Sequence, residues 1–250
     1  MMPFFKTLLL IALAPAAGML FSCSPDQQMD ADKLERQLLI VWIATETDDP
    51  TVARAATAAA LRNWNELRTA YLRVSPTAQE RDVLRRIDLW MVGLRNAVDN
   101  APAHRIISHL NQLHNNLGEL RPQYGMDHPL DLLYAFSRQW DWVSEISQDQ
   151  MMCLLEWGEY AVAYQQARNH WDRFQAIPPV YAAGTLPGRL SRSTTTEHAA
   201  LRLTNALADF ERQLAEANHG PMATSAAHVR TEFFHFLAAA VMYPAEVAAR

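Results

Sequence analysis

The sequence predicts an all-α protein, a tandem up-down helical bundle of two four-helix units with about eight helices after a signal peptide. Three features support this fold class. Apolar residues recur at alternating steps of three and four, capping residues and prolines divide the chain into segments of helical length, and no segment shows the period-two alternation of a strand. A spacing of about 3.5 residues favours helices that cross at about 20°, the shallow angle of four-helix bundles.

Residues 1–22 are predicted to be a signal peptide. Lys6 precedes an uninterrupted run of apolar or small residues from Leu8 to Phe21. This run is shorter than the roughly 20 residues that cross a bilayer. It suits instead the apolar part of a secretory signal, which is not part of the folded protein.

The end of this run, Leu20-Phe21-Ser22-Cys23, resembles the lipobox of bacterial lipoproteins, with Phe21 where a small or β-branched residue is usual. The resemblance implies cleavage before Cys23, acylation of that cysteine with chains such as palmitate, and a membrane anchor without a transmembrane helix. Stable anchoring takes more than one acyl chain, and lipoproteins carry several. Ser24 follows the cysteine, which by the same resemblance favours the periplasmic face of the outer membrane if the source cell has two membranes.

The first helical unit is predicted over residues 31–122, after a polar lipidated linker at 23–30. Its first helix runs from about Asp32 to Thr45. The next three helices open where a capping residue stands shortly before a proline. These openings are Asp49-Pro50, Ser75-Pro76 and Asn100-Ala101-Pro102. The unit closes at Arg121-Pro122.

The second unit is predicted over residues 127–242. Its four helices begin near Asp127, Met151, Thr194 and Asn218, and the last ends near Met242. The run from Thr194 to Glu197 fits a capping box. Residues 178–193 hold three prolines and two glycines without a hydrophobic period, so they are predicted as the one long loop.

The stretch from Met151 to Phe174 is predicted as the central helix, against which the rest packs. Seven residues follow the alternating steps on one stripe: Cys153, Trp157, Tyr160, Tyr164, Ala167, Trp171 and Phe174. The opposite side of its later half is polar: Gln165, Gln166, Asn169 and Arg173. Apolar residues such as Val162 surround the first half, as expected of a helix buried on several sides. We therefore expect the two units to meet there.

Matching stripes in the two halves predict an internal repeat. The second, third and fourth helices correspond to the sixth, seventh and eighth, at offsets of 107, 120 and 116 residues. In this alignment Trp64 corresponds to Trp171. Because any antiparallel bundle has a similar spacing, the repeat depends on the matched tryptophans and on the common order of the helices.

Charge and motifs exclude several classes of function. The formal net charge is −5, and the basic residues gather only at Arg81, Arg85 and Arg86, where acids are interspersed. Nucleic-acid binding needs a basic footprint, so no nucleic-acid partner is expected. The sequence has no nucleotide-binding loop, nucleophile elbow, zinc signature or Cys-x-x-Cys-His haem attachment site. Cys153 is predicted to be a small apolar core residue.

The candidate metal ligands are His228, Glu232 and His235, which share one face of the last helix. Glu232 and His235 have the Glu-x-x-His spacing of di-iron bundles. The corresponding helix offers Asn111 and His114 at that spacing instead of a second such pair. The three candidates also lie opposite the apolar stripe, so the alternative is a solvated, hydrogen-bonded surface.

Two further groups have a chemical and a structural interpretation. Glu156 and Glu159 would act as acid and base if apolar surroundings raised their pKa values, and as ion-paired residues at the core rim otherwise. Met126 and His128, in the run from Tyr124 to His128, would hold copper or haem iron. A turn followed by a helix cap accounts for the same run without a ligand.

The sequence therefore favours a lipid-anchored, periplasm-facing helical scaffold or protein-interaction module with no catalysis of its own. Its expected partners are the membrane, through the lipid on Cys23, and another envelope protein, and no cofactor is expected. The alternative is a small-molecule, metal or haem binding protein with its site between the two units. An enzyme ranks third, because no complete catalytic set is present in the sequence.

Overall fold

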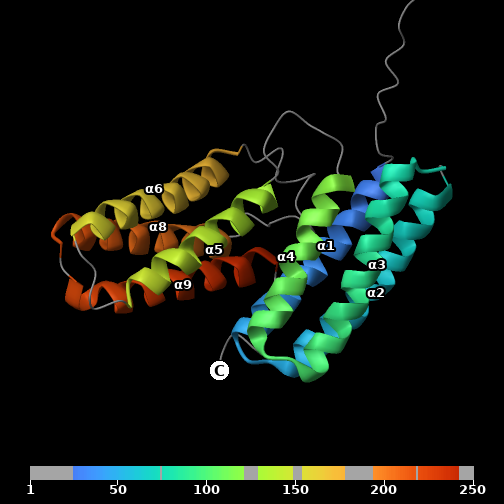
Figure 1. Cartoon of the computed structure of the whole chain (residues 1–250), viewed down its shortest axis with the longest axis horizontal. Coiled ribbons are helices and arrows are strands. Elements are labelled where there is room, and N and C mark those ends of the chain that lie inside the picture. The colour runs from blue at the N-terminus through green and yellow to red at the C-terminus, as the bar shows by residue number, and fades with distance from the viewer. Residues whose placement is uncertain are drawn as a thin grey trace, which may run out of the picture.

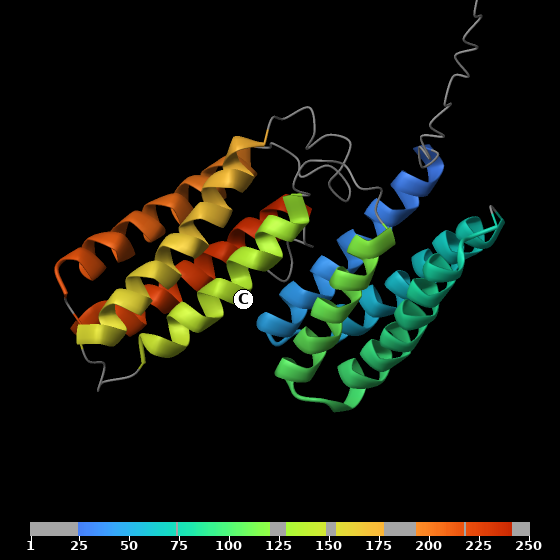
Figure 2. The same cartoon turned by 45° about the horizontal axis from the view of Figure 1, so that its top comes forward.

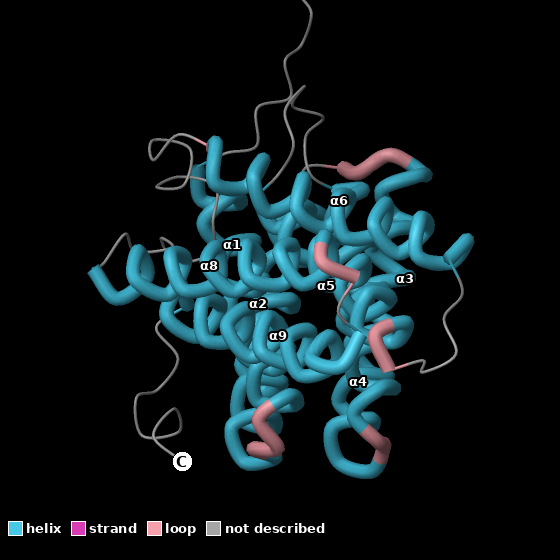
Figure 3. Tube along the Cα trace, turned by 90° about the vertical axis from the view of Figure 1, so that its left-hand side faces the viewer, coloured by secondary structure: helices cyan, strands magenta, loops and turns pink. Residues whose placement is uncertain are grey.

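A computed structural model describes residues 25–73, 75–120, 129–148, 154–177, 194–217 and 219–241. Within these ranges the regular structure is helical, and the loops between helices are short (Figure 3). The helices form two four-helix units, which lie side by side (Figure 1). The all-α prediction of two consecutive four-helix units is confirmed.

The first unit contains α1 (Pro25–Glu46), α2 (Pro50–Arg73), α3 (Ala78–Asn100) and α4 (Ala103–Leu120). The second contains α5 (Pro129–Ile146), α6 (Leu154–Ala176), α8 (Thr194–Ala215) and α9 (His219–Val241). The most extensive packing joins helices next to each other in the chain: α1 with α2, α3 with α4, α5 with α6, and α8 with α9. The pairs α2–α3 and α1–α4 close the first unit, and α6–α8 and α5–α9 close the second.

The helix starts follow the capping signals with one shift. Asp49 caps α2, because its carboxylate accepts a hydrogen bond from the Val52 amide at 3.0 Å. The third helix, however, does not open at Ser75-Pro76. Thr77 is its N-cap, and with Glu80 it forms a reciprocal capping box. Since a capping box satisfies two backbone amides, it displaces the weaker serine–proline signal by two residues.

The first helix begins earlier than the sequence analysis predicted. Residues 25–30, assigned there to a polar linker, already belong to α1. Pro25 stands at the first helical position, where its missing amide proton costs no hydrogen bond. The linker prediction was wrong for residues 25–30, which are helical although their sequence is polar.

The predicted apolar stripes form the core. In α2 the buried positions include Ala53, Thr57, Ala60, Trp64 and Leu67, and in α9 they include Met222, Ala226, Val229, Phe233 and Phe236. The two matched tryptophans, Trp64 and Trp171, are 1% and 0% exposed. Each indole donates a hydrogen bond to the next helix of its own unit, Trp64 to Asp88 at 2.7 Å and Trp171 to Thr204 at 3.0 Å. This shared role fits the proposed internal repeat.

The predicted central helix is not the most buried one. In the first half of α6, Gly158 and Glu159 are exposed and Val162 is 56% exposed. By contrast, every residue of α1 from Leu38 to Ala44 is buried. The reason is the position of α1, which packs on α2 and α4 on one side and on α9 of the second unit on the other. Among the described residues the units therefore meet at α1, and residues 151–156, at the start of the predicted central helix, lie outside the described side chains.

Candidate functional site

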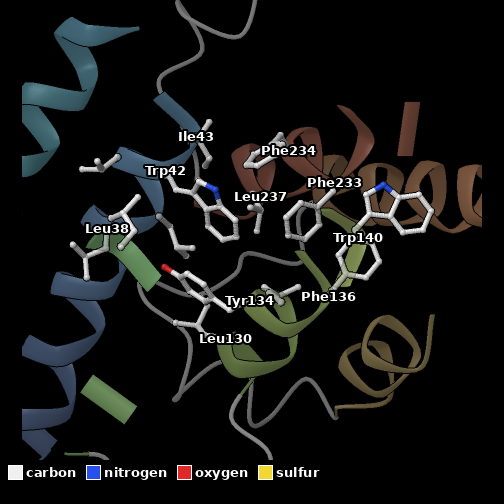
Figure 4. Close-up of a cluster of buried hydrophobic side chains, with 14 of the residues drawn as sticks. Leu38, Trp42, Ile43, Leu130, Tyr134, Phe136, Trp140, Phe233, Phe234 and Leu237 are labelled. Carbon is white, nitrogen blue, oxygen red and sulfur yellow. The ribbon is translucent and has the colours of Figure 1, made fainter. Parts of the chain in front are cut away.

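The junction between the two units is built around the indole of Trp42 on α1. Trp42 stacks on Tyr134 of α5 with ring centroids 4.8 Å apart. It also makes edge contacts with Phe233 at 6.0 Å and Phe234 at 5.6 Å, both on α9. Figure 4 shows the indole between these rings, with Leu237 beside it. Since Trp42 is 3% exposed, it is buried by residues of the other unit.

His114 joins a fourth helix to this junction. It lies on α4 of the first unit, is 5% exposed, and stacks on Tyr134 with ring centroids 3.8 Å apart. Its Nε2 is 2.9 Å from a carboxylate oxygen of Asp131 on α5. The sequence analysis named His114 only as part of a failed metal pattern. The structure gives it a different place, as a polar link across the two units.

Charged groups surround the aromatic contacts. The Arg230 guanidinium on α9 donates to Glu46 of α1 at 2.8 Å and to Asp141 of α5, and it lies 5.5 Å above the Phe234 ring. Burial alone would lower the pKa of Arg230, but Asp141 and Glu46 outweigh this effect and raise it. Arg36 of α1 donates to the carbonyl of Val241 at 3.1 and 2.9 Å. Through these links, residues 36–46 of α1 run antiparallel to residues 230–241 of α9.

Side chains fill the described part of this junction. Trp42, Tyr134, Phe233 and Leu237 are each buried, and the three rings contact one another through Trp42. The sequence analysis placed the site of a small-molecule or haem binder between the two units. Among the described residues, that position holds stacked aromatic rings. Such packing fixes one unit relative to the other.

The three candidate metal ligands lie on α9, but they differ in their exposure to solvent. His228 and His235 are exposed, whereas Glu232 is 8% exposed, so the expectation that all three face solvent was wrong for Glu232. Arg202 of α8 donates to the Glu232 carboxylate at 2.8 Å, and His235 Nδ1 lies 3.6 Å from the same oxygen. Within the described ranges, no group of three or more His, Cys, Asp or Glu side chains is arranged to hold a metal ion. The metal site stays a prediction for metal analysis to test.

The other candidates fall mostly outside the described residues. This applies to Cys23, to Cys153, to the run from Tyr124 to His128 and to the Glu156 side chain. Glu159 is described and is exposed. The acid–base interpretation required both carboxylates to lie in apolar surroundings, and the exposed Glu159 does not.

Several buried polar residues were not predicted from the sequence, among them Glu35 and Asn116. Glu35 of α1 is 6% exposed, and Asn116 of α4 is 4% exposed with its side-chain amide donating to the Gln112 carbonyl at 2.6 Å. In each case the residue lies where its helix packs against a neighbour. A polar residue next to an apolar stripe was the only available signal, and such positions are common at the edge of a buried face.

None of the described helices combines the length and apolar character that crossing a bilayer requires. Comparison with protein-family models, curated proteins and solved structures gives no match. The functional argument therefore depends on the residues and contacts of this chain.

Proposed function

We propose that the protein is a lipid-anchored, periplasm-facing scaffold or protein-interaction module, held at the membrane through acylated Cys23. One observation carries the proposal. Helix α1, which is buried at every position from Leu38 to Ala44, packs against both units and begins only two residues after Cys23. An anchor at that position holds the element to which both units are attached, so the whole protein is presented from the membrane as one body.

The contacts at the junction support a scaffold. The aromatic contacts of Trp42 and the double ion pair of Arg230 use large buried side chains to hold the units together. Large aromatic pairs contribute beyond their buried area. A rigid arrangement presents distant surfaces at a fixed separation, and this property suits a protein that binds a partner.

The anchor is tested on the full chain in its native membrane. We expect the mature protein to begin at Cys23 and to carry acyl chains, measured by mass spectrometry of the intact protein. Cys23→Ser should remove the acyl mass and release the protein from washed membranes. A non-acylated chain that still begins before residue 23 would disprove the anchor.

The interaction role is tested by crosslinking from several faces. Large exposed apolar residues lie on α3, α5, α6 and α8, one helix each: Leu89, Trp142, Val162 and Leu201. Four variants, each with a photo-reactive amino acid at one of these positions, form a matched set that is crosslinked in intact membranes. We expect one defined protein adduct from one or two of these faces. Equal adducts from all four faces, or none from any face, would count against the module.

The alternative class is tested on the same purified protein. A small-molecule, metal or haem binder is expected to retain its ligand through purification. A stoichiometric metal content or a haem absorption band would therefore reverse the order of the two hypotheses. Neither is expected for a scaffold.

A further inference from the structure

Covalent geometry places one end of the first unit next to Cys23. Only Ser24 separates Cys23 from Pro25, where α1 begins. Two consecutive Cα–Cα steps span at most about 7.6 Å. A lipid on Cys23 is therefore attached within about one helix diameter, roughly 10 Å, of the first turn of α1.

Three other helix ends share this end of the unit. Because α1 and α2 are antiparallel neighbours, the end of α2 lies beside the start of α1 (Figure 2). The Tyr71 hydroxyl on α2 donates to the Leu120 carbonyl at the end of α4, at 3.2 Å. Arg86 on α3 donates to Glu119 on α4 at 2.6 Å. The end of α2, the start of α3 and the end of α4 thus lie together near the anchor.

Apolar and basic residues are exposed at this end, beside the exposed acids Asp82 and Glu119. Leu72 is 48% exposed, and Arg73, Thr77 and Arg81 are exposed. We call these four residues the anchor-proximal surface. The Arg81 guanidinium donates to the Pro76 carbonyl at 2.5 Å, which holds its positive charge over the turn between α2 and α3. The turn between α1 and α2, at the far end of the unit, carries exposed Asp48 instead.

We propose that the anchor-proximal surface lies against phospholipid headgroups, with Arg73 and Arg81 paired to lipid phosphates and Leu72 in the headgroup layer. The proposal rests on the acylation of Cys23 given under the proposed function. Guanidinium groups match phosphate geometry and bind it in a bidentate manner. α2 has 24 residues and a rise of about 1.5 Å per residue. The first unit therefore stands about 35 Å out from the membrane.

The experiment measures how close each end of the unit lies to the lipid. The acylated protein with Cys153→Ala is reconstituted in phosphatidylcholine vesicles that carry a nitroxide quencher on the headgroup. A fluorophore is attached to Gln79→Cys or, as a matched control, to Asn96→Cys. Both positions are exposed on α3, and 17 residues of helix separate them by about 26 Å. We expect strong quenching at position 79 and little at position 96.

Two variants separate the surface from the anchor. A flexible Gly-Ser insertion between Ser24 and Pro25 keeps the lipid but lengthens the tether, so the difference between positions 79 and 96 should shrink. Arg73→Gln with Arg81→Gln should reduce quenching at position 79 while leaving the acyl mass unchanged. Unchanged quenching in the arginine variant would overturn the phosphate contact.

The experiment distinguishes the loss of the headgroup contact from the loss of the lipid anchor. Equal quenching at both positions in an acylated chain would overturn the headgroup contact and leave the anchor intact. A chain without acyl groups on Cys23 would overturn both. The mass of the intact protein, recorded on each sample, distinguishes these two results.

Discussion

At the scale of single residues, Gly93 shows how closely α3 and α4 approach. A Cβ atom at this position would lie 2.7 Å from Cε1 of His109 on α4. The His109 ring is also held against Trp90, with ring centroids 5.3 Å apart. The absence of a side chain at Gly93 therefore leaves room for the histidine.

A double-mutant cycle tests this contact. Gly93→Ala should gain about 1 kcal/mol of helix propensity and lose about 1–3 kcal/mol to overpacking. In a His109→Ala background the second effect disappears, so the same change should stabilise the protein by about 1 kcal/mol. The free energy of unfolding in urea measures both. Equal effects in the two backgrounds would show that the histidine moves aside at no cost.

Two histidines should make stability depend on pH. Burial lowers the pKa of His109, aided by Arg105, and burial with Arg138 lowers the pKa of His170, both from the ordinary 6.5. Below about pH 6.5 the unfolded chain then binds more protons than the folded chain. Stability should be full above that pH and should fall as the pH drops through the lowered pKa values.

The pH effect is measured as the difference between two proteins. Urea unfolding from pH 7 to pH 5 is compared for the native chain and for His109→Gln with His170→Gln. We expect the variant to lose less stability on acidification, because it removes two groups that favour the protonated unfolded state. Parallel pH profiles would assign the acid sensitivity to other groups.

At the scale of helices, the pairing of α8 with α9 includes one ion pair at the edge of the core. The Glu232 side chain is 10% exposed and that of Arg202 is 52% exposed. Removal of the arginine leaves a mostly buried carboxylate without its closest partner. We therefore expect Arg202→Ala to lower the free energy of unfolding by about 1–3 kcal/mol.

If the unpaired charge of Glu232 causes the loss of stability in Arg202→Ala, neutralising Glu232 should restore stability. Arg202→Ala with Glu232→Gln should recover most of the loss, as measured by urea unfolding. The same Glu232→Gln protein also tests the metal hypothesis. If Glu232 is a metal ligand, the purified native chain will contain metal that this variant lacks.

The predicted internal repeat concerns the arrangement of whole helices. Trp64 and Trp171 occupy corresponding places on α2 and α6, and each bonds to the following helix. The first and fifth helices do not correspond in burial. α1 is buried all round over residues 38–44, whereas Trp142 on α5 is 43% exposed. Both helices contact the other unit, α1 through Trp42 and α5 through Tyr134, but only α1 is covered on all sides over residues 38–44.

At the scale of the whole molecule, Trp42 decides whether the two units unfold together. Trp42→Ala removes ring contacts to α5 and α9 and should cost about 3–5 kcal/mol. Because these contacts cross the junction, calorimetry should change from one transition to two. Trp64→Ala is the matched control, since Trp64 is equally buried but lies within the first unit.

The control should lower stability without dividing the transition at the junction. Hydrogen exchange provides the second measurement: Trp42→Ala should expose amides of α9 near residues 233–237, and Trp64→Ala should not. A single transition in Trp42→Ala, with unchanged exchange in α9, would show that the polar links of Arg230 and His114 suffice.

Local sequence patterns were sufficient to predict the helices and their buried faces. Stripes such as Leu203, Leu207 and Phe210 are local patterns, and a period of about 3.6 residues selects the same face in any helical context. Caps such as Asp49 are local in the same way. The candidate residues on α9 were also placed correctly on one helix.

Which helix lies between the units, and which polar residues are buried, depends on the packing of distant segments. The sequence of α1 has the pattern of an ordinary amphipathic helix. Its second face is buried because α9 of the other unit covers it. Likewise Glu232 is buried by its partner Arg202, and His114 by Tyr134. The local spacing of residues shows which side chains share a face of a helix. Burial of a second face depends on contacts between segments far apart in the sequence. Arg36 and Val241, for example, are hydrogen-bonded although 205 positions separate them.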